Sequence, residues 1–290
     1  MPPRRRSSAP RVAFVLGGGG HAGAHEVGML QALLEADVRP ELVVGTSIGA
    51  VNGAAVAADP TLDTVARLRE LWLELDEDRI FGGSFLTGAA RLVRSRTHLH
   101  TNVAMRGLLT DLLPGTFADL AVPFQCVAAC IERAAEHWFH DGPLADAILA
   151  SAAVPGVLPP VEIGGEHFLD GGLVNSIPIS RAIELGATEI YVLQVGRVER
   201  PLTPPRTPLQ VALVTFEIAR RHRFARDLAG LPKGVTAHVL PTGQPVRPAR
   251  GALAEMNYRN FRDVSRRIDR AHRASSEYLA ALPHPGSGSA

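Results

Sequence analysis

The chain has 290 residues, of which 46% are hydrophobic and 20% are charged. This composition can build a sizeable core and is unlike that of a disordered chain. Thirty basic residues nearly balance twenty-nine acidic ones, leaving a formal net charge of +1, so nothing indicates a nucleic-acid partner. Because no apolar run approaches the roughly 20 residues of a membrane-spanning helix, a soluble globular protein is predicted.

Both ends of the chain are predicted to be tails. Residues 1–10, MPPRRRSSAP, are basic and should be disordered, and no apolar segment of signal-peptide type follows them. Residues 284–290 should form a flexible tail. Cys126 and Cys130 belong to one predicted strand, in which four residues span about 13 Å, too far for a disulfide. We therefore expect free core thiols, a reducing compartment and a cytoplasmic protein.

Short apolar runs alternate with longer amphipathic segments from Arg11 onward. The apolar runs predict strands at residues 11–16, 41–44, 123–131, 136–140, 166–169, 189–195 and 235–240. The amphipathic segments predict helices at residues 24–36, 47–58, 62–75, 102–113, 143–153, 178–186, 208–229 and 252–281. This alternation is typical of a mostly parallel sheet with helices on both faces, a three-layer α/β/α fold. No boundary divides residues 11–283, which are expected to form a single domain.

A glycine-rich turn, GGGGHAG at residues 17–23, follows the first predicted strand and precedes a predicted helix. Gly18, Gly20 and Gly23 fit the pattern G-x-G-x-x-G, which is typical of dinucleotide-binding turns and allows a nucleotide-binding oxidoreductase. The acidic residue that would bind the ribose should end the second strand, whereas Glu41 begins it. The N–H groups of such a turn can instead hold an oxyanion that forms during a reaction.

The second predicted strand ends in GTSIG, residues 45–49, and a helix of small residues follows. A G-x-S-x-G pattern between a strand and a helix is that of a nucleophile elbow. Gly45 and Gly49 leave room for a tight, strained turn that presents the hydroxyl of Ser47, while the helix directs its N-terminus at the site. Ser47 is therefore predicted to be a nucleophile.

A serine nucleophile needs a base, and no histidine occupies a recognisable position for that role. Asp170 follows a short apolar strand in FLDGGLVNSIPI. Gly171 and Gly172 allow the backbone to approach another element closely, which delivers the carboxylate at a strand end. The alternative is an ordinary Asp-Gly turn.

The glycine-rich turn, GTSIG, DGG and the stretch SAAVPGVLPPVEIGGEHFLDGGLVNSIPI, which begins at Ser151, together resemble the patatin-like phospholipase family, over about residues 12–195. The resemblance implies a patatin-like α/β/α domain, and the helices predicted from the pattern in residues 208–283 would be additional to it. It also implies a serine acyl hydrolase of the phospholipase A, lysophospholipase or carboxylesterase type. Such an enzyme would act on acyl esters of lipids, without cofactor or metal.

The resemblance also assigns site residues. Ser47 would be the nucleophile and Asp170 its base, in a dyad without histidine. The backbone N–H groups of Gly18, Gly19 and Gly20 would form the oxyanion hole. The remaining motif positions, expected to support this geometry, are Gly17, His21, Gly23, Gly45, Gly49, Gly171 and Gly172.

One position departs from the family pattern. Ala22 stands where members usually carry arginine or lysine, and His21 precedes it. Either the backbone donors act alone, or His21 takes a partial role. The departure also leaves open a catalytically silent protein of this family that binds lipid or a partner.

Two basic segments bear on membrane contact, residues 90–100 and residues 220–226. SFLTGAARLV, which begins at Ser84, is mildly amphipathic and could belong to a lid. Such clusters are usually solvated helix faces. The alternative is transient binding to an anionic surface, at the inner face of the membrane. The sequence makes no prediction of oligomeric state.

Overall fold

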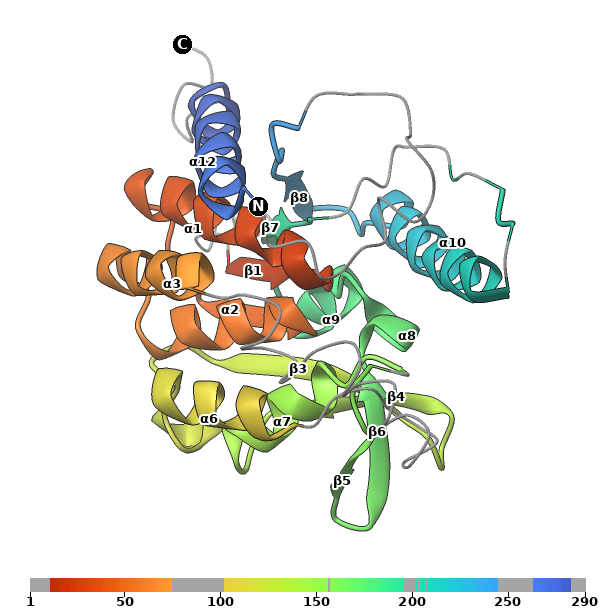
Figure 1. The fold of residues 1–290 in the computed structure, drawn as a ribbon. Coiled ribbons are helices and arrows are strands. Elements are labelled where there is room, and N and C mark those ends of the chain that lie inside the picture. Colours follow the sequence, from red (N-terminus) through yellow and green to blue (C-terminus); the bar gives the residue numbers. More distant parts are fainter. Residues whose placement is uncertain are drawn as a thin grey trace, which may run out of the picture.

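A mixed sheet forms the centre of the protein. The computed structural model describes residues 11–74, 102–155, 157–195, 202, 204–206, 208–244 and 263–282. The strand order is β5-β6-β3-β2-β1-β7-β8, with β4 paired to β3 (Figure 1). The parallel part consists of β3 (Phe124–Cys130), β2 (Leu42–Thr46), β1 (Val12–Leu16), β7 (Glu189–Leu193) and β8 (Thr236–Val239). The antiparallel part consists of β4 (Ala135–Phe139), β5 (Val161–Ile163) and β6 (Glu166–Asp170).

Helices cover both faces of this sheet. Successive residues of β1 point to opposite faces, and the side chains on both faces are buried. Phe14 and Leu16 belong to one core cluster, whereas Ala13 and Val15 belong to the other. The first cluster is shared with α1 (Ala24–Glu35), α2 (Ile48–Ala58), α3 (Leu62–Glu74), α6 (Val103–Leu112), α7 (Leu144–Ser151) and α12 (Val264–Ala280). The second is shared with α9 (Ile179–Glu184) and α10 (Pro208–Ala229), and short α8 (Gly172–Asn175) contacts α10. The predicted three-layer α/β/α architecture is confirmed (Figure 1).

The predicted elements match the structure with three differences. All seven predicted strands are present, but the three-residue strand β5 was not predicted, because two prolines precede it and two glycines follow it. The four-residue helix α8 was also not predicted. The predicted helix over residues 252–281 is not continuous, because Asp263 has a left-handed φ of 61° and α12 begins at the next residue. Residues 252–262, like the two predicted tails at residues 1–10 and 284–290 and like residues 84–100, lie outside the described part.

Two strands meet end to end along one edge of β3, and this arrangement creates the site. β2 runs parallel to β3, and its last residue, Thr46, pairs with Val127. β6 runs antiparallel, and its last residue, Asp170, pairs with Ala128. A strand has two edges, and β4 occupies the other one over residues 126–130. The carboxyl ends of β2 and β6 therefore face each other.

Both cysteines lie on β3 and are buried without a disulfide, which confirms the expectation of free core thiols. Burial raises the pKa of the Cys126 thiol, so this group stays protonated. Within the described ranges, no helix combines the length and the apolar character that crossing a bilayer requires.

Candidate active site

Ser47 lies in the turn between β2 and α2, in a backbone conformation that is rare for a residue with a side chain. Its φ is 55° and its ψ is −123°, a strained geometry typical of nucleophile elbows. The flanking glycines make this turn possible. A Cβ at Gly45 would lie 2.6 Å from the carbonyl oxygen of Gly49, and one at Gly49 would lie 2.5 Å from that of Leu16. The predicted need for small residues at both positions is confirmed.

Asp170 accepts a hydrogen bond from the hydroxyl of Ser47. The Oγ atom of Ser47 donates to Oδ2 of Asp170 at 2.6 Å, and the N–H of Gly172 donates to Oδ1 at 2.7 Å. Ser47 and Asp170 are both buried, with 6% and 5% of their surface exposed. Gly171 passes so close to the carbonyl of Val127 that a Cβ would not fit. The close backbone approach predicted for this motif is therefore present.

Burial also changes the proton affinity of this carboxylate. It raises the pKa of Asp170 from 3.8 to about 6, and the hydrogen bonds from Ser47 and Gly172 offset only part of that rise. The hydrogen bonds of Ser47 and Asp170 within the described residues involve no histidine. The arrangement is a serine and aspartate pair, in which the carboxylate is a stronger base than one in water.

Ser151, at the end of α7, ties the two halves of this pair together. Its Oγ atom accepts a hydrogen bond from the N–H of Ser47 at 2.9 Å. Its carbonyl accepts one from the N–H of Gly171 at 3.0 Å. Ser151 is fully buried. It opens the stretch SAAVPG that carries part of the family resemblance, but no individual role was predicted for it.

The glycine-rich turn lies directly against Ser47. A Cβ at Gly18 would be 3.3 Å from Cβ of Ser47. The N–H of Gly18, however, donates to the carbonyl of Ser176 at 2.9 Å. Its predicted role as an oxyanion donor is therefore wrong in this structure, because that N–H already has a partner. For the N–H groups of Gly19 and Gly20, the described residues provide no acceptor.

The turn continues into a short 3-10 helix, Gly20–Gly23, which contains His21 and Ala22. A Cβ at Gly23 would lie 2.7 Å from Cγ1 of Ile48, the residue that follows Ser47. Gly23 thus allows the turn to pack on the start of α2. A part for His21 in the chemistry stays a prediction.

A buried polar network that contains Glu26 and Asn52 contacts the end of this turn. Glu26, on α1, is completely buried and accepts a hydrogen bond from Nδ2 of Asn52 at 2.7 Å. The same Nδ2 atom donates to the carbonyl of Gly23 at 3.1 Å. The indole N–H of Trp72 donates to Oδ1 of Asn52 at 3.1 Å. Burial raises the pKa of Glu26 well above its usual value, against the opposing effects of Asn52 and the Gly17 backbone. No role was predicted for Glu26. The signal that could have indicated a buried polar group is an acidic residue within the apolar segment AHEVGML.

The basic segment of residues 220–226 is not simply a solvated helix face. Arg220 and Arg221 both pair with Glu217, at 2.8 and 2.7 Å. Their side chains are only 8% and 15% exposed. The interpretation as a patch for anionic lipid does not hold for these two arginines.

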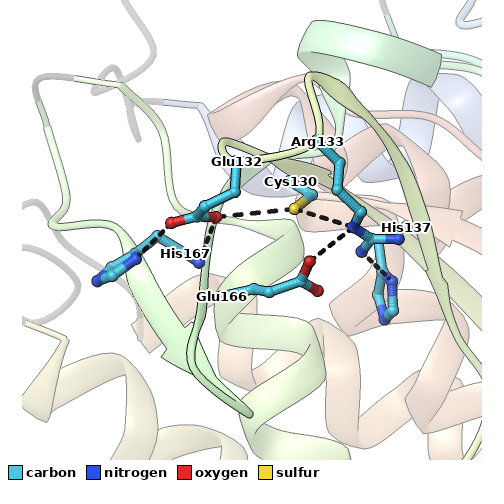
Figure 2. A network of polar contacts seen from close by, with 6 residues as sticks. All are labelled: Cys130, Glu132, Arg133, His137, Glu166 and His167. Atoms are coloured by element: carbon cyan, nitrogen blue, oxygen red, sulfur yellow. Dashed lines mark hydrogen bonds and ion pairs between the residues drawn. The ribbon is translucent and has the colours of Figure 1, made fainter.

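A second group of polar residues, here called the hairpin cluster, lies at the opposite end of β6 (Figure 2). Glu132 accepts hydrogen bonds from the backbone N–H of His167 at 2.9 Å and from its ring at 2.7 Å. Arg133 pairs with Glu166 at 2.8 Å and contacts the sulfur of Cys130 at 3.3 Å. The sixth member, which bonds to Arg133, is His137.

In the part of the chain that the structure describes, no group of side chains is arranged to hold a metal.

The sequence profile of the patatin-like phospholipase family matches residues 14–183, more than half of the chain. The chain belongs to the patatin-like phospholipase family. An uncharacterized NTE family protein of Mycobacterium tuberculosis is 35% identical to it over 176 residues, 61% of this chain and 46% of that protein. A lysophospholipase of Aspergillus terreus is 28% identical over 206 residues, 67% of this chain and 12% of that protein. This patatin-like chain thus corresponds to less than half of these relatives.

Proposed function

We propose that this patatin-like protein is a serine acyl hydrolase that cleaves fatty-acyl esters of lipids. The observation that carries the proposal is the buried hydrogen bond of 2.6 Å between Ser47 and Asp170. It places a hydroxyl in a strained elbow against a carboxylate of raised pKa. This is the relation of nucleophile and base that covalent acyl transfer requires.

In the proposed acylation step, Oγ of Ser47 attacks the ester carbonyl while its proton passes to Oδ2 of Asp170. The tetrahedral intermediate carries a negative oxygen, held by the N–H groups of Gly19 and Gly20. When the intermediate collapses, the carbon–oxygen bond to the alcohol breaks, and the departing oxygen takes the proton from Asp170. An acyl ester of Ser47 remains.

Hydrolysis of this acyl-enzyme repeats the sequence with water. Asp170 takes a proton from water as the water oxygen attacks the acyl carbonyl, and it returns the proton to Oγ of Ser47 as the fatty acid leaves. Each oxyanion donor contributes on the order of 10² to 10³ in rate. The loss of the Gly18 N–H from the predicted set makes Gly19 and Gly20 the proposed donors.

Family membership and the lysophospholipase among the relatives support a lipid ester as the substrate. They also argue against the dinucleotide interpretation of the glycine turn. A catalytically silent lipid-binding protein is the remaining alternative, and the alanine at position 22 is the feature that favours it.

A fluorophosphonate probe, which reacts with activated serines, tests the proposal. We expect rapid labelling of the wild-type chain, none of Ser47→Ala and very slow labelling of Asp170→Asn. Ser265→Ala, which removes a serine from α12, is the matched control and should label like wild type. Hydrolysis of lysophospholipid and of p-nitrophenyl esters should follow the same order.

The outcomes separate the alternatives. A wild-type chain that does not react with the probe contradicts an activated Ser47. A chain that is labelled at Ser47 but releases no fatty acid from any ester supports the silent alternative instead.

A further inference from the structure

Arg220, on α10, reaches the glycine turn from more than 200 residues away in the sequence. Its Nη1 atom donates to the carbonyl oxygen of Gly18 at 3.2 Å. The rest of the guanidinium is held by Glu217, from Nε to Oε2 at 2.9 Å and from Nη2 to Oε1 at 2.8 Å. This two-point contact fixes the plane of the guanidinium group. The contact with Gly18 therefore has a defined direction.

An ion pair surrounds this contact beside the turn. Arg220 and Arg221 both pair with the carboxylate of Glu217. Burial raises the pKa of Glu217, but the hydrogen bonds and charges of the two arginines overcome this effect and lower it. Glu217 therefore holds both arginines in place as a carboxylate. Because the three side chains are largely buried, the charge of Arg220 is weakly screened at the turn.

We propose that Arg220 is a positioning residue of the oxyanion turn, replacing from α10 the basic side chain that position 22 lacks. The proposal rests on the proposed function of Ser47 and Asp170. It answers the question left open by Ala22 and His21, since the positive charge comes from neither position.

The effect follows from the geometry of a peptide bond. In a trans peptide, the carbonyl and the N–H point in opposite directions within one plane. The carbonyl of Gly18 and the N–H of Gly19 belong to the same peptide, so a hydrogen bond to the first orients the second. Glycine backbones have little intrinsic preference that could do this. A cation on the carbonyl also polarises the peptide and makes its N–H a stronger donor.

The same helix also contacts the other side of the site. Arg223 donates to the carbonyl of Val174 in α8 at 2.7 Å and pairs with Glu136 at 2.7 Å. α8 begins two residues after Asp170. α10 therefore links the glycine turn to the segment that follows the base. This helix lies outside the residues that match the family, 14–183.

Three variants of α10 test the role of Arg220. Arg220→Gln removes the charge, Arg220→Lys keeps it, and Arg226→Gln removes an exposed arginine of the same helix as the matched control. Active sites are first counted by complete labelling of Ser47 with a fluorophosphonate. The kcat per labelled site and the KM are then measured with p-nitrophenyl butyrate, together with inhibition by a trifluoromethyl ketone, which forms a tetrahedral oxyanion on the serine.

We expect Arg220→Gln to lower kcat per labelled site by about tenfold to a hundredfold, because an oxyanion donor loses its orientation. The KM should stay within about twofold, and the ketone should bind more weakly by a factor similar to the loss in kcat/KM. Arg220→Lys should recover part of the rate, and Arg226→Gln should behave like wild type.

Other results overturn the proposal in recognisable ways. If Arg220→Gln reduces the number of labelled sites but leaves kcat per site unchanged, the arginine only stabilises the fold. An unchanged affinity for the ketone would equally exclude a role at the oxyanion. If the wild-type chain neither reacts with the probe nor hydrolyses the ester, the proposed function fails and the role of Arg220 fails with it.

Discussion

Two carboxylates near opposite ends of β6 have opposite environments. Asp170, at the end of β6, is buried with a pKa of about 6. Glu132, beside the start of β6, is exposed, and its pKa is lowered to about 2 by the backbone N–H of His167 and then by the His167 ring. Both accept two short hydrogen bonds from other residues. The number of donors therefore does not decide the direction of the change.

Solvent access decides it. At Glu132, water remains available, and the donors add to an already solvated charge. At Asp170, burial removes that solvation, and a serine hydroxyl and one N–H replace only part of it. The result is one carboxylate that can accept a proton near neutral pH and one that joins the turn after β3 to strand β6. The comparison separates the proposed site of the chemistry from a polar contact that stabilises structure.

The largest contrast is expected in activity. Asp170→Asn should lower kcat/KM for a p-nitrophenyl ester by about 10³-fold or more, since an amide cannot take the proton of Ser47. Glu132→Gln should stay within about twofold of wild type. Steady-state kinetics on both variants, with circular dichroism as the folding control, measures the difference. Equal losses in the two variants would show that the comparison is mistaken.

The pH dependence should sharpen the contrast. Asp170 acts as a base only when ionised, so kcat/KM should fall about tenfold per pH unit below pH 6 and level off above it. Glu132→Gln should leave this limb in place, because Glu132 remains ionised down to about pH 2 in wild type. A profile between pH 4.5 and 8.5 on both chains provides the measurement. A limb that moves in Glu132→Gln, or a flat wild-type profile, would contradict the assignment.

The main parts of the site were visible in the sequence because they depend on local geometry. The strained turn at Ser47 needs Gly45 and Gly49 within two positions, and the approach of Asp170 to β3 needs Gly171 beside it. Short-range requirements of this kind leave a readable pattern. The alternation of strands and helices likewise predicted the layers, since each element must bury its apolar side.

The remaining parts depend on contacts between distant segments. The N–H of Gly18 donates to the carbonyl of Ser176. The carbonyl of Gly18 accepts a hydrogen bond from Arg220. Neither contact leaves a mark in the local sequence. In RRHRFAR, the burial of Arg220 depends on the packing of α10 against α8 and α9, so composition alone suggested a solvated surface.

Stability should respond in opposite directions at the two carboxylates. A pKa of Asp170 raised from 3.8 to about 6 means that folding favours the protonated form, so wild-type stability falls as pH rises from about 4 to about 6. The rise corresponds to about 3 kcal/mol, part of which the weaker hydrogen bonding of an amide removes. Asp170→Asn should therefore raise Tm by a few degrees at pH 8 and have little effect at pH 4. Thermal melts across this range test it, and a lower Tm at pH 8 would contradict a destabilising charge.

The smallest effect is expected at Glu132, with the opposite sign. Its lowered pKa means that the ionised form stabilises the fold above the usual glutamate pKa of 4.5, and that this contribution is lost as pH falls toward 2. Glu132→Gln should lower Tm by about 1–2 °C at pH 7, and less at pH 3 or in 1 M salt, which screens exposed charges. Glu162→Gln is the matched control, because that carboxylate lies 4.0 Å from the other ring nitrogen of His167 and is more exposed. It should leave Tm unchanged. If Glu132→Gln instead raised Tm at pH 7, as expected for Asp170→Asn, exposure would not be what distinguishes the two carboxylates.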